Sequence, residues 1–135
     1  MSIATIHDRL STSAMLFSAI CVVWGLLNYF RKQPVTGGYW GGLVILEILM
    51  VAQVVTGIAF AISGGGQLLR PIVHILYGAT MVISLPAAYI YTSGKDTRQE
   101  NLIYALVSLW LVFIVERGMT TGREGMAALL LQLLA

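Results

Sequence analysis

The sequence predicts an all-α integral membrane protein, an up-down-up-down four-helix transmembrane bundle with a short apolar C-terminal segment. The first observation is composition: 58% of the 135 residues are hydrophobic and only 10% are charged, against about 25% charged residues in soluble domains. The second is the grouping of apolar residues into four runs, each close to the roughly 20 residues that a helix needs to cross a bilayer. The third is that these runs lack the period-2 alternation of barrel strands, so the backbone groups in lipid must be paired within helices.

The first two crossings are predicted over residues 10–30 and 39–62. A polar stretch that finishes at Pro34 ends the first run, and the glycines of residues 63–66 end the second. Glycine and proline stop helices and favour turns. We therefore expect short connections and antiparallel neighbours here.

The third and fourth crossings are predicted over residues 71–91 and 98–117. Pro71 stands at an early helical position, where its missing N–H costs little. Thr97 and Glu100 have the spacing of a capping box and indicate the start of the fourth helix. Four antiparallel helices with short loops form an up-down-up-down bundle.

The last ten residues, 126–135, are almost wholly apolar and follow a glycine- and threonine-rich stretch, residues 118–125, which we expect to be a hinge. Ten helical residues extend only about 15 Å, half a bilayer, so they cannot form a fifth crossing. A helix lying on a membrane normally has a strongly polar face. We therefore predict a transmembrane domain over residues 1–125 and a docking segment, residues 126–135, that packs on a neighbouring subunit.

The connectivity places both termini and the second loop at one end of the bundle, called the terminal end, and the other two loops at the opposite loop end. Basic residues are divided equally between the ends, so the positive-inside rule gives no clear orientation. Both lysines lie at the loop end, and we expect that end in the cytoplasm of a bacterium, with both termini on the outer face of its inner membrane. The basic residues are Arg31, Lys32, Lys95 and Arg98 at the loop end and Arg9, Arg70, Arg117 and Arg123 at the terminal end.

Several classes of function are excluded or disfavoured. A net charge of +2 from 8 basic and 6 acidic residues is too small for a surface that neutralises a row of phosphates, so we expect no nucleic-acid partner. The sequence has no nucleotide-binding loop, zinc-binding spacing or nucleophile elbow. We therefore predict no catalytic residue and no metal site.

The two histidines, His7 and His74, both fall at the terminal end and can meet there. Two imidazoles facing each other in a small bundle can ligate a b-type heme, whereas interfacial histidines can equally bind headgroups or neighbouring side chains. Arg70 and Tyr77 share a helix face with His74 and form a rim suited to a quinone head or a lipid phosphate. Because both histidines lie near helix starts, we expect no heme bound by this chain alone; the alternative is a heme or quinone shared with a partner.

Glu47 is the charged residue deepest in an apolar run. A charge there costs at least about 2.5 kcal/mol, so Glu47 should face protein or water. The alternatives are a proton relay, an ionic contact with another subunit, and a protonated carboxyl bonded to a neighbouring helix. Glu116 and Arg117 emerge from the fourth crossing at the terminal end, where Glu116 is a possible partner of Arg70 or His74.

The run Arg-Pro-Ile-Val-His-Ile-Leu-Tyr-Gly, residues 70–78, the histidines at two helix entrances and the short basic loop near Lys95 carry a resemblance. The chain resembles the small hydrophobic accessory subunits of bacterial quinol-oxidising complexes such as alternative complex III. It is similar, more distantly, to cytochrome b561-type bundles, but lacks their inward histidines for two hemes.

The accessory-subunit resemblance implies a non-catalytic subunit of a respiratory or photosynthetic electron-transport complex. Such a subunit packs and seals lipid around catalytic subunits, near a quinone site, and its partners are other integral membrane subunits and lipids. Two alternatives stay open from the residues alone: a small b-heme or quinone-binding redox membrane protein, and a homo-oligomeric transporter or channel.

Overall fold

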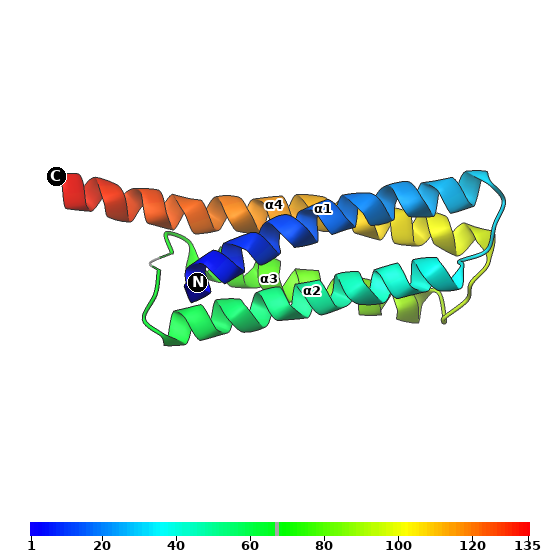
Figure 1. Cartoon of the computed structure of the whole chain (residues 1–135), viewed down its shortest axis with the longest axis horizontal. Helices are drawn as coiled ribbons and strands as arrows, with labels where there is room; N and C mark the ends of the chain where they lie inside the picture. Colours follow the sequence, from blue (N-terminus) through cyan, green and yellow to red (C-terminus); the bar gives the residue numbers. More distant parts are fainter. Residues whose placement is uncertain (67) are drawn as a thin grey trace.

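The computed structural model describes residues 1–66 and 68–135, and all regular structure in that part of the chain is helical. The helices run up, down, up and down along one long axis, as Figure 1 shows. Each is long and apolar enough to cross a membrane. The predicted all-helical, four-helix architecture is confirmed. The helices are α1 (Ile3–Phe30), α2 (Gly37–Ile62), α3 (Pro71–Tyr91) and α4 (Arg98–Leu134).

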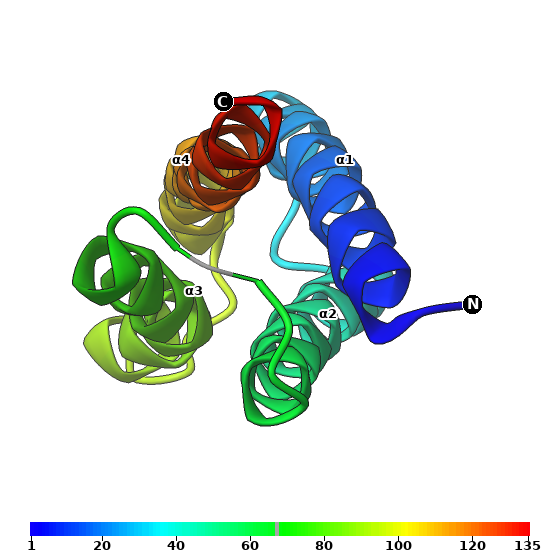
Figure 2. The same ribbon diagram turned by 90° about the vertical axis from the view of Figure 1, so that its left-hand side faces the viewer.

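The four helices form a ring in which each packs on its two neighbours (Figure 2). The contact between α1 and α4 is the most extensive, and the contact between α2 and α3 is the least extensive. As a result α1 and α3 face each other diagonally across the interior. Both termini and the loop between α2 and α3 lie at the terminal end (Figure 1).

The first helix begins seven residues before the apolar run from which it was predicted. The Ser2 side chain accepts a hydrogen bond from the Thr5 backbone N–H at 3.2 Å and caps the helix. Such a cap satisfies one of the unpaired N–H groups at a helix start. His7 therefore lies within α1 and not on a frayed terminus, which matters for the site described below.

The fourth helix continues without a break through residues 118–125, where a hinge was expected. Glycine in a helix costs only about 1 kcal/mol relative to alanine, and the hydroxyls of the two threonines in this stretch are hydrogen-bonded within the helix. The hydroxyls of Thr120 and Thr121 donate to the carbonyls of Glu116 and Arg117, four residues earlier, at 3.0 and 3.1 Å. The C-terminal segment is thus a direct extension of α4, and it projects beyond the rest of the bundle (Figure 1).

The loop end is held together by hydrogen bonds between the two loops and the helices. The Val35 N–H donates to the Asp96 carbonyl at 2.8 Å and joins the loops to each other. Asn101 is fully buried, accepts from Asn28 Nδ2 at 3.3 Å and donates to the Gln33 carbonyl at 2.9 Å. The contact between Asn28 and Asn101 was not expected from the sequence.

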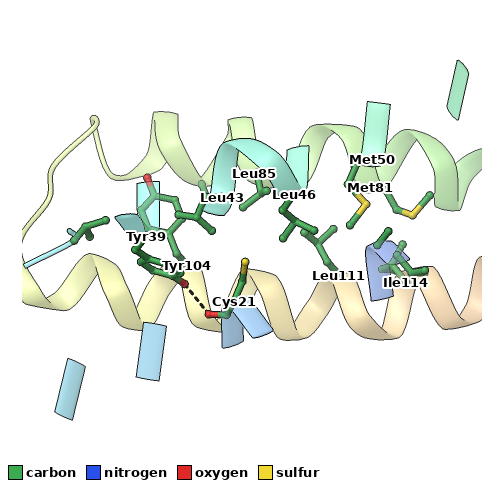
Figure 3. Packing of buried hydrophobic residues seen from close by; sticks show 14 residues of the cluster. Cys21, Tyr39, Leu43, Leu46, Met50, Met81, Leu85, Tyr104, Leu111 and Ile114 are labelled. Carbon is green, nitrogen blue, oxygen red and sulfur yellow. Dashed lines mark hydrogen bonds between the residues drawn. The ribbon is translucent and has the colours of Figure 1, made fainter. Parts of the chain in front are cut away.

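The core runs along the centre of the bundle and combines large residues from all four helices with small ones from α1. Figure 3 shows part of this packing, including the hydrogen bond that the Tyr39 hydroxyl donates to the Cys21 carbonyl at 3.0 Å. Gly25 leaves the space for that hydroxyl, because a Cβ atom there would collide with Tyr39 and lie 2.9 Å from the Asn101 carbonyl oxygen. The fully buried members of the core are Ala14, Cys21, Tyr39, Leu46, Met50 and Leu111.

Candidate functional site

His7 of α1 and His74 of α3 meet inside the terminal end of the bundle. Their ring centres are 6.3 Å apart, and the ring planes are inclined by 56°. Both side chains are half-buried. The two residues expected from sequence to meet are therefore brought together, and they come from the two diagonally opposed helices.

The orientation of His7 is fixed by α2. Its Nδ1 atom lies 3.1 Å from the Gln53 carbonyl oxygen and 3.3 Å from the Thr56 hydroxyl oxygen. The Thr56 hydroxyl donates its own hydrogen to a helix carbonyl, either of Ala52 at 2.9 Å or of Gln53 at 3.0 Å. Both neighbours of Nδ1 are thus acceptors, so we assign the ring hydrogen to Nδ1 from this network. The Nε2 atom of His7 then carries the lone pair, and Gln53 Nε2 lies 3.3 Å from it.

His74 is held in the same way by α4. Its Nδ1 atom lies 3.0 Å from the Thr121 hydroxyl oxygen. That hydroxyl donates to the helix carbonyls of Arg117 or Gly118, at 3.1 and 3.0 Å, so it accepts from His74. By the same reasoning Nδ1 carries the hydrogen and Nε2 has the lone pair.

Each helical hairpin therefore contains one histidine and one Thr-Gly pair that supports it. Thr56 and Gly57 serve His7 in the first hairpin, and Thr121 and Gly122 serve His74 in the second. A Cβ atom on Gly57 would lie 2.9 Å from Cε1 of the His7 ring, and one on Gly122 would lie 3.6 Å from that of His74. The two Thr-Gly pairs were visible in the sequence as a sign that the hairpins repeat each other, but they were not recognised there.

Gln53 completes the cluster and was also not selected from sequence. Its side chain is 4% exposed; its Nε2 donates to the Ser11 hydroxyl and lies 3.3 Å from His7 Nε2. Its Oε1 atom is buried without a hydrogen-bond partner among the residues that the structure describes. Buried amide oxygens nearly always accept a hydrogen bond, so the Gln53 Oε1 atom is an acceptor that lacks a donor.

The charged residues of the terminal end pair differently from the sequence-based expectation. Arg70, which precedes the first residue of α3, lies 4.0 Å from Glu124, one helical turn beyond Thr121. Glu116 instead lies beside the Thr120 hydroxyl, which donates either to its carboxylate at 2.9 Å or to its backbone carbonyl at 3.0 Å, and Arg117 is exposed. The sequence made Glu116 a possible partner of Arg70. Because α4 continues as a helix past residue 118, Glu124 lies beside Arg70 instead. Tyr77 packs at the edge of the core.

Glu47 lies in a separate, apolar groove between α2 and α3. The groove measures about 140 Å³, and Leu85, Pro86 and Tyr89 of α3 line its far side. The carboxyl is half-buried, and within the described part of the chain its buried Oε2 atom has no hydrogen-bond partner. Gln53 faces the core while Glu47 faces this groove, so the two do not form one polar path.

Residues 1–66 and 68–135 contain no group of three or more histidine, cysteine or acidic side chains that would hold a metal ion. Comparison with protein-family models, with curated proteins and with solved structures gives no match for the chain. The class that the fold defines is a bundle of four helices, each long and apolar enough to span a membrane. Inside its terminal end, polar side chains gather in a cluster formed by His7, Ser11, Gln53, Thr56, His74 and Thr121.

Proposed function

We propose that this protein is a small, non-catalytic integral membrane subunit of a bacterial electron-transport complex, where it packs against larger membrane subunits. The four apolar helices support its placement in a membrane. The resemblance to accessory subunits of quinol-oxidising complexes supports the kind of complex. The proposed place of action is the bacterial inner membrane.

The observation that carries the proposal is the C-terminal extension of α4. The helix has 37 residues and is therefore about 55 Å long, whereas a bilayer core is about 30 Å thick. Leu130, Leu131, Leu133 and Leu134 are between 52% and 84% exposed. At 3.6 residues per turn these four side chains fall within an arc of about 160°, on a helix that projects alone beyond the bundle (Figure 1).

Leaving such leucines in water is costly, because burying each of them is worth about 1.5–3 kcal/mol. These leucines form one broad apolar face that the other three helices leave uncovered. A groove on a partner subunit would cover this face. The same reasoning favours a hetero-oligomeric subunit over an independent monomer.

The test is native purification of the full chain through an N-terminal tag, with identification of the chains that accompany it. We expect integral membrane subunits of an oxidoreductase complex in fixed ratio to the tagged chain. A chain truncated after Gly125 should remain in the membrane and lose these partners, while the matched variant Gln132→Ala should keep them. Unchanged co-purification of the truncated chain, or a complex made only of copies of this chain, would reject the proposal; the second result would favour the transporter or channel alternative.

A further inference from the structure

We propose that His7 and His74 are the two axial ligands of a single b-type heme bound inside the terminal end of the bundle. This site is formed by the chain alone and does not depend on the accessory-subunit proposal. It also differs from the sequence-based expectation of no heme in the isolated chain. That expectation treated both histidines as residues near helix starts. In the structure both lie inside the bundle, and hydrogen bonds to α2 and α4 hold their rings.

The separation of the two rings is the one that a shared iron requires. An imidazole nitrogen lies about 2 Å from a metal ion that it binds and about 1 Å from the centre of its own ring, so two axial imidazoles have ring centres about 6 Å apart. The ring centres of His7 and His74 are 6.3 Å apart. No movement of α1 relative to α3 is needed to reach this spacing.

The hydrogen bonding of the two rings is that of metal-ligating histidines. A ligating histidine typically donates its second N–H to a nearby oxygen, which fixes the tautomer and raises the basicity of the ligating nitrogen. Nδ1 of His7 donates to Gln53 and Thr56 of α2, and Nδ1 of His74 donates to Thr121 of α4. Both Nε2 atoms are left with lone pairs, which is the state that binds iron.

The present partner of one lone pair is easily replaced. Gln53 Nε2 lies 3.3 Å from His7 Nε2, a long hydrogen bond, and the same nitrogen donates to Ser11. The Gln53 Oε1 atom is buried and has no donor within the described residues. The Gln53 amide is therefore poorly satisfied where it stands.

The neighbours of the pair suit a flat macrocycle. Besides the hydrogen-bonding residues of α2 and α4, Gly57 and Gly122 lie beside the two histidine rings and have no side chain to fill the space there. Deeper in the core are Met50 and Met81, whose unbranched side chains adapt to irregular shapes. The contact between α2 and α3 is the least extensive in the bundle, so the ring can extend between these two helices. Arg70, at the mouth of the site, has an exposed guanidinium for a propionate.

Other ligands fit the cluster less well. A structural zinc ion takes four protein ligands and a catalytic one takes three, whereas the described residues offer only two imidazoles here. Heme iron needs two axial ligands on opposite sides of the porphyrin, and the porphyrin supplies the other four nitrogens. The pair of histidines on diagonally opposed helices meets that requirement.

The test uses the full chain, expressed in heme-sufficient cells, purified in detergent and titrated with hemin. We expect about one heme per chain and a six-coordinate low-spin absorption spectrum in the oxidised and reduced states. His7→Ala and His74→Ala should each lower the heme content at least tenfold. The control variant Ile75→Ala, next to His74 on the same helix but 66% exposed, should bind heme like the wild type. Circular dichroism confirms that each variant is still helical.

A second variant separates ligation from a structural role. His74→Met keeps an axial ligand but changes it from imidazole to thioether, which raises the reduction potential of a heme. We expect retained heme with a more positive midpoint potential and an altered spectrum. Four results would overturn the proposal: a helical wild-type chain that binds no heme, heme that both alanine variants retain, a five-coordinate high-spin spectrum, or a stoichiometric divalent metal or quinone at the site in place of heme.

Discussion

His74 Nδ1 lies 3.0 Å from the Thr121 hydroxyl oxygen, forty-seven residues further along the chain. His7 and Thr56 repeat this relationship in the first hairpin, at 3.3 Å and a separation of forty-nine residues. In both pairs the next residue after the threonine is a glycine packed beside the histidine ring. The two hairpins therefore present equivalent histidines to the same interior space.

Thr121→Val should destabilise the bundle by about 1–3 kcal/mol, because valine keeps the shape of threonine but leaves the His74 Nδ1–H without its acceptor. Thr121→Ser should retain most of the stability. The neighbouring Thr120 is bonded at an exposed site on the outside of the helix, so Thr120→Val is the matched control and should change stability by less than about 0.5 kcal/mol. Reversible unfolding in mixed detergent micelles, followed by circular dichroism, measures all three. Equal effects at Thr120 and Thr121 would contradict the assigned hydrogen bond.

The fold was predictable because hydropathy and segment length determine which segments can cross a bilayer. The four predicted crossings lie within α1 to α4. The encounter of His7 with His74 also followed from topology, since two crossings between them return the chain to the same end. The hydrogen bonds that hold the two histidine rings were not predictable in the same way, because they depend on which face of α2 and of α4 turns inward.

The end of α4 shows why local sequence signals misled the analysis. Glycine and threonine are weak helix formers in isolation, so residues 118–125 indicated a hinge. In the structure Gly118 and Gly125 are buried, and the helix continues despite a propensity cost of about 1 kcal/mol per glycine. Continuing the helix also places Glu124 beside Arg70, which no pattern in the sequence indicated.

Gly25→Ala should destabilise the protein by about 1–3 kcal/mol, the usual cost of overpacking a core. An added Cβ atom would collide with the Tyr39 hydroxyl and would also lie 2.9 Å from the Asn101 carbonyl oxygen, which the backbone holds in place. Gly41→Ala is the control, because a Cβ atom at Gly41 meets nothing within 4 Å. It should leave stability unchanged or raise it by up to about 1 kcal/mol. Thermal unfolding in detergent gives the comparison, and a neutral Gly25→Ala would mean that α1 and α4 pack less closely than described.

Asn101→Ala should cost about 1–3 kcal/mol, because it leaves the buried Asn28 amide and the Gln33 carbonyl without a partner. The double variant Asn28→Ala with Asn101→Ala should cost less than the sum of the two single variants, because they remove two ends of one hydrogen bond. A double-mutant cycle of unfolding free energies measures this coupling. Strict additivity would show that the two amides do not interact.

Glu47 provides the last prediction, which separates a structural carboxyl from a proton relay. The carboxyl lies half-buried in an apolar groove, and the structure shows no hydrogen-bond partner for its Oε2 atom within residues 1–66 and 68–135. Removing a buried polar atom that lacks a partner relieves a cost of about 1–3 kcal/mol. If the role is structural, Glu47→Met should therefore raise the unfolding free energy by about that amount, and Glu47→Gln should preserve insertion and assembly.

The matched control for Glu47→Gln is Glu116→Gln, which makes the same change on the exposed face of α4. The readouts are unfolding in detergent and proton-coupled turnover of the purified complex. A relay requires a group that releases and regains a proton, so both Glu47 variants would abolish coupling in an intact complex while Glu116→Gln leaves it unchanged. Normal coupling in Glu47→Met, together with higher stability, would establish that the carboxyl is dispensable for proton transfer and that its contribution is confined to the groove between α2 and α3.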